Sequence, residues 1–318
     1  MKTVRTAVIG VGHLGRWHAD KFAALPESEL IAVCDSDGAR AAEIAAPLGV
    51  EAVTDYRSLI GRVDAVSIVV PTTWHHEVAK WFLEHDVHVL LEKPITTTVE
   101  QADELIAIAR ARGCVLQVGH LERFNAAIQA LDTVLEQPLF IESHRLAPFK
   151  PRGTDVSVVL DLMIHDIDII LDIVGSRIER IDANGASILS GETDIANARI
   201  RFENGCVANV TASRVSMHSE RRMRLFQHDS YLSVDFQDRV LKVCRKGERE
   251  MVPGVPEIAC EEQAFDNNDA LLVEARAFLH AIQTGSEPVV SGEDGRRALQ
   301  TAMEIGRLLN ENLPESMR

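Results

Sequence analysis

Short apolar runs alternate with amphipathic segments over roughly the first 120 residues of the chain. The runs are rich in Val, Ile and Leu and have the length of buried strands, and the segments between them repeat their apolar positions at helical spacing. We expect strands at residues 3–10, 29–35, 63–70, 87–93 and 114–120, and helices at residues 10–25, 36–49, 73–85 and 97–113. Strands that alternate with helices predict a doubly wound parallel sheet, which we place at residues 1–124.

The pattern changes from about residue 125 onward. After one strongly apolar helix, β-rich runs follow one another with turn residues between them, and two amphipathic helices close the chain. The expected strands lie within residues 177–189, 193–205, 206–216, 221–236 and 238–247, and the expected helices are residues 269–285 and 293–312. This succession predicts an antiparallel meander, so residues 125–318 are expected to form a second, α+β domain.

The strongly apolar helix, residues 158–171, carries a narrow polar ridge. At about 100° per residue the ridge occupies a sector about 60° wide, and apolar side chains fill nearly all other positions. Its members are Asp161, His165, Asp168 and Asp172. Such a helix is mostly buried, so the ridge is expected to face a cleft or a paired network, although the polar stripe of an ordinary amphipathic helix stays an alternative. Asp166 lies off the ridge, and we expect it to contact the rest of its domain.

A glycine turn, Gly10-x-Gly12-x-x-Gly15, follows the first expected strand and opens the first helix. The three glycines would allow a tight turn, the close approach of a pyrophosphate, and the packing of helix on strand. Asp35 ends the second strand at the distance where dinucleotide-binding folds place an acid. It would bind the adenosine ribose and repel a 2′-phosphate, which favours NAD over NADP, although nearby Arg40 weakens the preference and Asp35 could merely cap the next helix.

Composition and charge narrow the class of partner. The chain has 318 residues, enough for two domains, and a formal charge of −15, which disfavours nucleic acid and anionic membranes. Its five cysteines lie far apart without a CxxC pair, so neither a zinc site nor a redox pair is expected, and scattered thiols fit a reducing cytoplasm. Neither a signal peptide nor an apolar run of about 18 residues is evident. We expect a cytoplasmic protein without a bound metal.

Five short motifs occur in an order and spacing that resembles the Gfo/Idh/MocA oxidoreductases. The motifs are residues 10–19, 71–79, 90–96, 118–125 and 161–168, and the resemblance extends from residue 4 to about residue 175. It implies an N-terminal Rossmann domain that binds NAD, followed by a domain built on a large, mostly antiparallel open sheet. Because the open face of such a sheet has to be covered, we expect a homodimer or homotetramer.

The resemblance also implies roles for particular residues. Lys93, at the carboxyl end of an expected strand, belongs to a Glu-Lys-Pro motif and would stabilise alkoxide charge beside nicotinamide. Asp161 and His165 match the DxxxH pair of the family, with His165 as the base and Asp161 orienting its imidazole. Cofactor contacts are expected at Gly10, Gly12, His13, Leu14, Asp35, Thr72, His75, Glu92 and Lys93.

One departure from the broad family narrows the expected substrate. Many members carry a glycine-rich run before the DxxxH pair and a Gly two residues after its Asp, whereas this chain has residues 156–159 and Met163 at those places. Together with residues 118–125, this is similar to the bacterial UDP-N-acetylglucosamine 3-dehydrogenases, which make a 3-keto sugar nucleotide for later amination. The resemblance therefore implies oxidation at C3 of UDP-N-acetylglucosamine, a sugar aminotransferase as the next enzyme, and a product used in lipid A or other cell-envelope sugars.

A basic cluster would suit the diphosphate of such a substrate. Its members are Arg123, Arg145, Lys150 and Arg152, and Asn125 is expected to contact the substrate as well. Two alternatives stay open: a dehydrogenase of a free polyol such as inositol, and a non-catalytic NAD-binding regulator. Retention of Lys93, Asp161 and His165 argues against the regulator, which has little need of them.

Overall fold

The computed structural model describes residues 3–150, 156–266 and 269–312, and it divides the chain into two compact units. Unit 1 contains the described residues up to Phe124 together with residues 269–299, and unit 2 contains the rest. A division therefore lies at the expected boundary after residue 124. Residues 269–299 also belong to unit 1, although we had expected them in the second domain.

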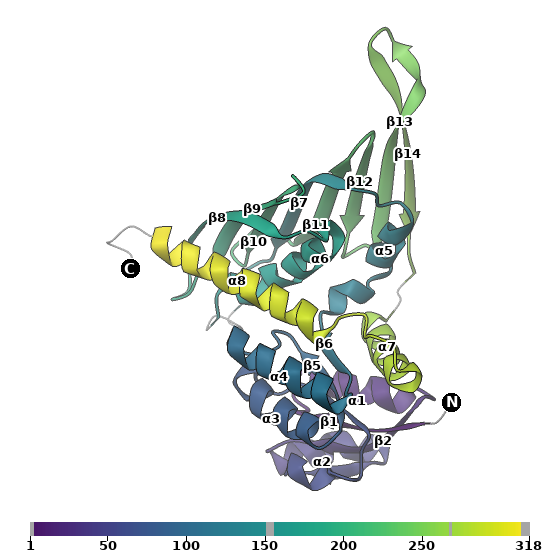
Figure 1. The fold of residues 1–318 in the computed structure, drawn as a ribbon, viewed down its shortest axis with the longest axis vertical. Coiled ribbons are helices and arrows are strands. Elements are labelled where there is room, and N and C mark those ends of the chain that lie inside the picture. Colours follow the sequence, from purple (N-terminus) through teal and green to yellow (C-terminus); the bar gives the residue numbers. More distant parts are fainter. Residues whose placement is uncertain (1–2, 151–155, 267–268, 313–318) are drawn as a thin grey trace. The chain divides into compact units, whose positions relative to one another are not determined.

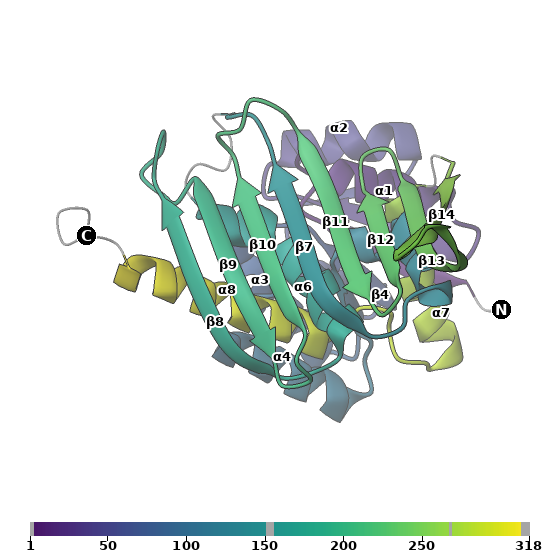
Figure 2. The ribbon, with the colours of Figure 1, turned by 90° about the horizontal axis from the view of Figure 1, so that it is seen from above.

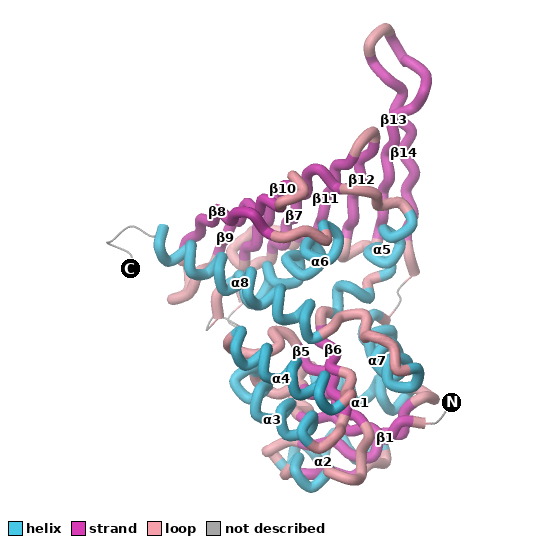
Figure 3. The backbone as a smooth tube through the Cα atoms, viewed as in Figure 1, coloured by secondary structure: helices cyan, strands magenta, loops and turns pink. Residues whose placement is uncertain are grey.

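Unit 1 is built on a six-stranded parallel sheet in the order β3-β2-β1-β4-β5-β6, flanked by helices (Figures 1 and 3). Its strands are β1 (Val4–Ile9), β2 (Ser28–Cys34), β3 (Glu51–Val53), β4 (Ala65–Ile68), β5 (His88–Glu92) and β6 (Leu116–Gly119). Its helices are α1 (Gly15–Ala24), α2 (Gly38–Leu48), α3 (Thr72–Glu84), α4 (Val99–Arg112) and α7 (Ala270–Thr284), with the short 3-10 helices η1 (Tyr56–Leu59) and η2 (Leu121–Phe124). The predicted doubly wound Rossmann sheet is confirmed, and the three-residue β3 was not anticipated.

The α7 helix returns to unit 1 because its apolar face completes the core there. Ala275, Phe278 and Leu279 of α7 are buried together with Val8 of β1 and Phe22 of α1. Spacing of i, i+3 and i+4 places these three side chains on one face of the helix. The unit to which α7 belongs is therefore determined by the core that it completes and not by its position in the sequence.

Unit 2 is built on an eight-stranded sheet in the order β14-β13-β12-β11-β7-β10-β9-β8. Its strands are β7 (Pro138–Leu146), β8 (Ile178–Ala186), β9 (Ile195–Phe202), β10 (Val207–Ser213), β11 (Glu220–Gln227), β12 (Ser230–Asp235), β13 (Val240–Val252) and β14 (Val255–Ala264). Neighbouring strands are antiparallel except for the parallel pair β7 and β10, which confirms the predicted mostly antiparallel sheet.

Helices cover one face of this sheet, as Figure 2 shows for α6 and the C-terminal part of α8. The helices are α5 (Ala126–Gln129), the 3-10 helix η3 (Ala130–Thr133), a π-helical turn η4 (Val159–Met163), α6 (Ile164–Val174) and α8 (Gly292–Asn312), which passes from unit 1 to unit 2 after Leu299. The side chain of Asn312 ties the end of α8 to the carbonyl of Ala183 on β8. This layer places α6 against β7 and β10.

The expected meander is interrupted by β7, which lies between β10 and β11 although it precedes α6 in the chain. We did not predict a strand at residues 138–146. The inward-facing positions of β7 include Ser143 and Arg145, both buried, so the apolar alternation that marks a half-buried strand is weak. The pattern failed here because a charged side chain has a buried partner.

A long hairpin formed by β13 and β14 projects from unit 2 (Figure 1). Cys244 and Cys260 lie directly opposite each other in its register and form a disulfide. Our expectation of scattered thiols was wrong for these two residues, because a hairpin brings together cysteines that are far apart in sequence. Among the described residues, we find no helix whose length and apolar character would let it span a membrane.

Helix α7 also brings a buried carboxyl group into unit 1. Glu274 has no exposed surface, and neither carboxyl oxygen has a hydrogen-bond partner among the described residues. The amide of Gln117 on β6 donates instead to the main-chain oxygen of Glu274. Burial, and to a smaller extent the charge of Glu92, raises the pKa of Glu274 well above its usual value. A buried carboxyl group without a partner is held in its protonated form.

We expect the substitution Glu274→Gln to raise stability increasingly as the pH rises. The folded pKa of Glu274 is raised, so unfolding releases its proton once the pH exceeds the pKa of an unfolded glutamic acid, about 4.3. Wild-type stability should fall above that pH by at most about 1.4 kcal/mol per pH unit, whereas the Gln amide has no proton to release. Melting temperatures measured between about pH 5 and about pH 8 should therefore diverge in favour of the variant. Glu43→Gln, at an exposed position, is the control, and a pH-independent offset would contradict the expectation.

Candidate active site

The glycine turn between β1 and α1 has the geometry that a pyrophosphate requires. Gly10 has φ +85°, and a Cβ there would lie 2.8 Å from the carbonyl oxygen of Val69. A Cβ on Gly15 would lie 1.8 Å from the carbonyl oxygen of Gly10, whereas one on Gly12 would meet nothing within 4 Å. Two glycines are therefore fixed by packing, and the third faces open space. Leu14 at the N-cap of α1 makes no side-chain cap hydrogen bond, and the positive end of the helix dipole at this N-terminus favours a phosphate.

Asp35 closes this turn from the end of β2. Its Oδ2 accepts a hydrogen bond from the main-chain N–H of Val11 at 3.0 Å, and its Oδ1 accepts one from the N–H of Asp37, also at 3.0 Å. The cap of α2 is Asp37, which accepts from the N–H groups of Ala39 and Arg40. The alternative that Asp35 caps this helix is therefore wrong.

Arg40 lies close to both acids of this turn. Its guanidinium nitrogens lie 3.8 Å from the Asp35 carboxylate and 3.7 Å from that of Asp37. The residue that could have paired with a 2′-phosphate thus already faces two carboxylates. The local charge favours an adenosine ribose with a free 2′-hydroxyl.

Glu92 ends β5, and Lys93 follows it at the same edge of the sheet. Glu92 Oε2 accepts a hydrogen bond from the main-chain N–H of Lys93 at 3.1 Å. Burial raises the pKa of Glu92, but hydrogen bonding and charge from His18 and the charge of Lys93 outweigh it, and the net pKa is lowered. The peptide between Lys93 and Pro94 is cis. An ionised carboxylate thus holds the backbone at Lys93.

His75, on the first turn of α3, is buried and braces the same segment. Its Nδ1 lies 2.9 Å from the carbonyl oxygen of Pro94, and its Nε2 lies 2.9 Å from that of Val70. Burial lowers the pKa of His75, although the two carbonyl contacts favour the protonated ring. The ring connects the turn after Lys93 to the loop after β4. The expected contacts of His75 and Thr72 with the cofactor stay predictions, as do those of His13 and Leu14, which are exposed.

In unit 2 the polar ridge begins in the π-helical turn η4 rather than in a regular α-helix. Asp161 lies within η4, and α6 begins at Ile164. A π turn spaces residues differently from an α turn and is frequent at functional sites, so the even 100° spacing does not hold through Asp161. Asp161 and His165 are half-buried, and Asp168 is buried.

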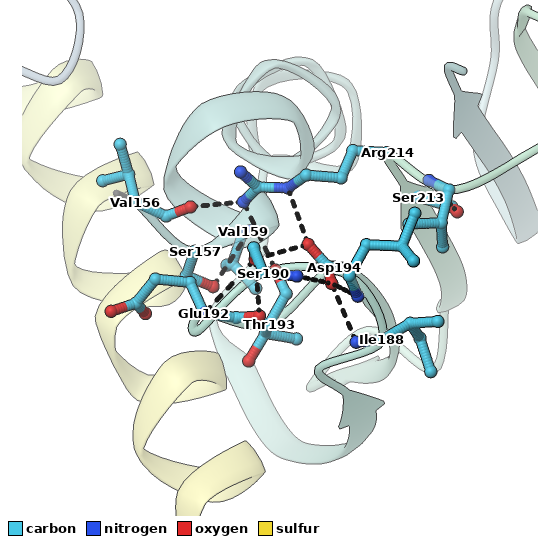
Figure 4. A network of polar contacts seen from close by, with 12 residues as sticks. Val156, Ser157, Val159, Ile188, Ser190, Glu192, Thr193, Asp194, Ser213 and Arg214 are labelled. Atoms are coloured by element: carbon cyan, nitrogen blue, oxygen red, sulfur yellow. Dashed lines mark hydrogen bonds and ion pairs between the residues drawn. The ribbon is translucent and has the colours of Figure 1, made fainter. Parts of the chain in front are cut away.

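A buried ion pair lies beside the start of η4 (Figure 4). Asp194 is fully buried, and its Oδ2 accepts hydrogen bonds from the main-chain N–H groups of residues 188–190 at 2.6 to 2.9 Å. Its Oδ1 accepts from the Ser190 hydroxyl at 2.6 Å and lies 3.6 Å from Arg214 Nε. Burial by itself raises the pKa of Asp194, but these hydrogen bonds outweigh burial, and the net pKa lies below its usual range.

The same pair fixes the backbone that leads to Asp161. Arg214 Nη2 donates to the carbonyl oxygens of Val156 and Thr193 (Figure 4). The Thr193 oxygen also accepts from the N–H of Val158, and the N–H of Asp161 itself donates to the carbonyl of Ser157 at 3.1 Å. Asp161 is therefore one turn away from a segment that a buried guanidinium holds.

A second buried ion pair anchors α6 to the sheet. Arg145 of β7 donates from Nε and Nη2 to the two carboxylate oxygens of Asp166 at 2.9 and 3.0 Å, and both side chains are buried. We had placed Arg145 in the basic cluster for a diphosphate. That prediction is corrected here, since a bidentate contact with Asp166 occupies the guanidinium. It also supplies the domain contact that was expected of Asp166.

The other expected substrate residues have diverse settings. Arg123 is 8% exposed in η2, and Lys150 is exposed. Asn125 caps α5, since its Oδ1 accepts from the N–H of Ala127 at 3.0 Å, and its Nδ2 donates to the carbonyl of Phe236 at 3.3 Å. Arg152 lies outside the described residues. Substrate contact by Arg123, Asn125, Lys150 and Arg152 stays a prediction.

Two family models match this chain. One, described as "Oxidoreductase family, NAD-binding Rossmann fold", covers residues 4–120, and the other, the "GFO/IDH/MocA C-terminal domain", covers residues 137–230. The chain belongs to the Gfo/Idh/MocA oxidoreductase family. It is an oxidoreductase with an NAD-binding Rossmann domain, as predicted.

Individual relatives cover nearly the whole chain. The UDP-N-acetylglucosamine 3-dehydrogenase of Acidithiobacillus ferrooxidans is 43% identical over 303 residues, which is 95% of this chain and 96% of that protein. A solved structure of that name from the same species has a TM-score of 0.89 at 41% identity and covers 98% of this chain and 99% of its own. The myo-inositol 2-dehydrogenase of Thermotoga maritima is 26% identical over 329 residues, 97% of each chain.

Sequence reasoning missed the pair of Asp194 and Arg214. A signal for it exists in this Gfo/Idh/MocA chain, because the two residues flank the ends of a predicted antiparallel strand pair. Asp194 precedes β9 and Arg214 follows β10, and the register pairs Ile195 with Ser213. Opposite charges just outside such a pair are brought together by the sheet itself.

We expect NAD to bind at least tenfold more tightly than NADP, because a 2′-phosphate would meet the carboxylates of Asp35 and Asp37, a difference of about 1.4 kcal/mol or more. Titration of tryptophan fluorescence measures both affinities, since Trp17 lies on the first turn of α1. Asp35→Asn should narrow the ratio, while Asp132→Asn, an exposed position in unit 2, should leave it unchanged. Equal affinities in the wild type would overturn this expectation.

Proposed function

We propose that this protein uses NAD to oxidise the C3 hydroxyl of UDP-N-acetylglucosamine to a 3-keto sugar nucleotide. The observation that carries the proposal is the similarity, over nearly the full length of both chains, to the UDP-N-acetylglucosamine 3-dehydrogenase of Acidithiobacillus ferrooxidans. Residues 156–159 and Met163, where many family members have glycines, support the same subgroup.

The chemistry is assigned to three side chains of this chain. Bound NAD would supply the acceptor for the hydride that leaves the sugar carbon. His165 removes the hydroxyl proton as the general base, and Asp161 orients the imidazole and stabilises its cation. Lys93 stabilises the negative charge that develops on the sugar oxygen. The fixed backbone at Lys93 and the anchored start of η4 support these roles, because catalytic groups need supported positions.

For the substrate, we assign the diphosphate to Arg123, Lys150 and Arg152, with Asn125 alongside. The proposed product carries a ketone, which an aminotransferase would convert to an amine in the next step. We place the reaction in the cytoplasm, on the way to an amino sugar of lipid A or another cell-envelope glycolipid. The similarity to inositol 2-dehydrogenases supports a second candidate, the oxidation of a free cyclic polyol.

Purified protein, NAD and UDP-N-acetylglucosamine should yield NADH and a sugar nucleotide lighter by two hydrogens. Hydrazine traps the ketone and draws the oxidation forward, and absorbance and mass spectrometry give the two readings. myo-Inositol in a parallel reaction tests the second candidate. Turnover of inositol alone would replace the proposal with that candidate, and no turnover of either by NAD-loaded protein would leave both without support.

In the same assay, His165→Ala should lower kcat by roughly 10² to 10⁴ while leaving the Kd for NAD unchanged, since the base acts only on the substrate. His228→Ala, at an exposed position in unit 2, is the matched control. A loss below about tenfold would remove His165 from the role of base.

We also propose that the open face of the large sheet is covered by a second copy of the chain, giving a homodimer or homotetramer. The projecting hairpin supports self-association, since Met251, Val252 and Ile258 are 71%, 56% and 63% exposed. Light scattering on the purified protein should give at least twice the monomer mass of 35.1 kDa. A monomer at micromolar concentration would refute this proposal.

A further inference from the structure

Beneath the turn that carries Lys93, unit 1 contains a buried row of three polar side chains. Ser67 belongs to β4, His18 to α1 and Glu92 to the end of β5, so three separate elements supply the row. Ser67 is 1% exposed, His18 is 3% exposed, and the Glu92 side chain is 15% exposed. We predicted a cofactor contact for Glu92 and gave no role to the other two.

The distances make the row continuous. Ser67 Oγ lies 2.8 Å from His18 Nδ1, and His18 Nε2 lies 3.2 Å from Glu92 Oε1. An ionised carboxylate only accepts hydrogen bonds, so Nε2 carries the proton and donates to Glu92 in either charge state of the ring. The contact with Ser67 fixes the rotation of the imidazole ring about its Cβ–Cγ bond.

Glu92 is held on its other sides as well. Its Oε2 accepts from the N–H of Lys93, and its carboxyl end lies against Gly119 of β6, where a Cβ would be 3.2 Å from both Cδ and Oε1. A side chain on residue 119 would push the carboxylate away. Hydrogen bonds to His18 and to the N–H of Lys93 thus hold the two carboxylate oxygens, and the glycine at position 119 leaves room for them.

We propose that His18 is a positioning residue for the reaction: held by Ser67, it fixes Glu92, and Glu92 fixes Lys93 at the edge of the sheet. The inference rests on the proposed function, in which Lys93 stabilises the developing alkoxide. A misplaced cation loses much of its effect on charge that develops only in the transition state, so loss of the row lowers kcat rather than cofactor affinity.

A purely structural role explains the row less well. Burial of a carboxylate and an imidazole in a core is unfavourable unless each is paired, and apolar residues would fill the same space at lower cost. Nearby Glu274 shows the outcome without a partner, since both of its carboxyl oxygens lack one among the described residues and it is held neutral. Glu92 has partners and keeps its charge, and it lies directly before Lys93 in the chain.

Two substitutions separate the halves of the row. The amide nitrogen of His18→Gln reaches approximately the place of Nε2 and still donates to Glu92, whereas the shorter side chain of His18→Asn ends near the place of Nδ1 and retains only Ser67. We expect His18→Asn to lower kcat at least about tenfold with the Kd for NAD changed less than about threefold, and His18→Gln to stay within about threefold of wild-type kcat. Thermal unfolding of both variants reports their folding.

A second reading does not depend on substrate. Acetic anhydride labels amines according to their freedom and protonation, and peptide mass spectrometry gives the labelling rate of Lys93 relative to the exposed Lys150. In His18→Asn, Lys93 should be labelled at least about threefold faster than in the wild type, and in His18→Gln at the wild-type rate. Ser67→Ala removes the contact that fixes the imidazole. If His18→Asn does not fold, Ser67→Ala takes its place, and it should lower kcat and raise the labelling rate of Lys93.

Equal kcat values for the Asn and Gln variants, or a wild-type labelling rate in His18→Asn, would overturn the inference. A parallel fall of kcat and melting temperature in both variants would make His18 structural. Should the wild type fail to oxidise UDP-N-acetylglucosamine, the proposed function fails by itself, and the contrast in labelling still decides whether His18 positions Lys93.

Discussion

Two buried ion pairs hold the segment of unit 2 that carries Asp161 and His165. Arg145 joins α6 to β7 through Asp166, and the pair of Arg214 and Asp194 holds the chain before η4. Removal of one partner leaves an uncompensated buried charge, which typically costs about 3–5 kcal/mol. Apolar packing alone would tolerate small shifts of this helix, whereas a bidentate Arg–carboxylate contact defines one register.

The cofactor domain could be predicted because its constraints are local. A turn that needs φ +85° at Gly10, and that has no room for a side chain at Gly15, leaves its trace in a six-residue motif. Asp35 is a local signal as well, because it follows the next strand and accepts a hydrogen bond from the backbone of the glycine turn. The parallel sheet adds short apolar runs, and the resulting pattern of strands and helices indicates the fold of the first 120 residues except for short elements such as β3.

Unit 2 resisted prediction where partners are distant in sequence. The strand β7 was missed because Arg145 faces inward toward a residue 21 positions away, and the disulfide was missed because a hairpin brings Cys260 opposite Cys244. The π turn at Asp161 changes the spacing that a uniform helix assumes. The return of α7 to unit 1 depends on a core whose other buried members lie between Val4 and Leu90, far earlier in the chain. Apart from the π turn, each failure is a contact whose partner a local pattern does not contain.

The two units support their candidate catalytic segments by the same physical rule. In each, a charged side chain is buried together with its partner just beside the residue assigned to chemistry: Glu92 before Lys93, and Arg214 at the backbone before Asp161. Because a buried charge is stable only with its partner in place, such a contact resists displacement in all directions. Glu274 marks the limit of the rule, since a carboxyl group without a partner gives up its charge and can no longer hold a neighbouring cation.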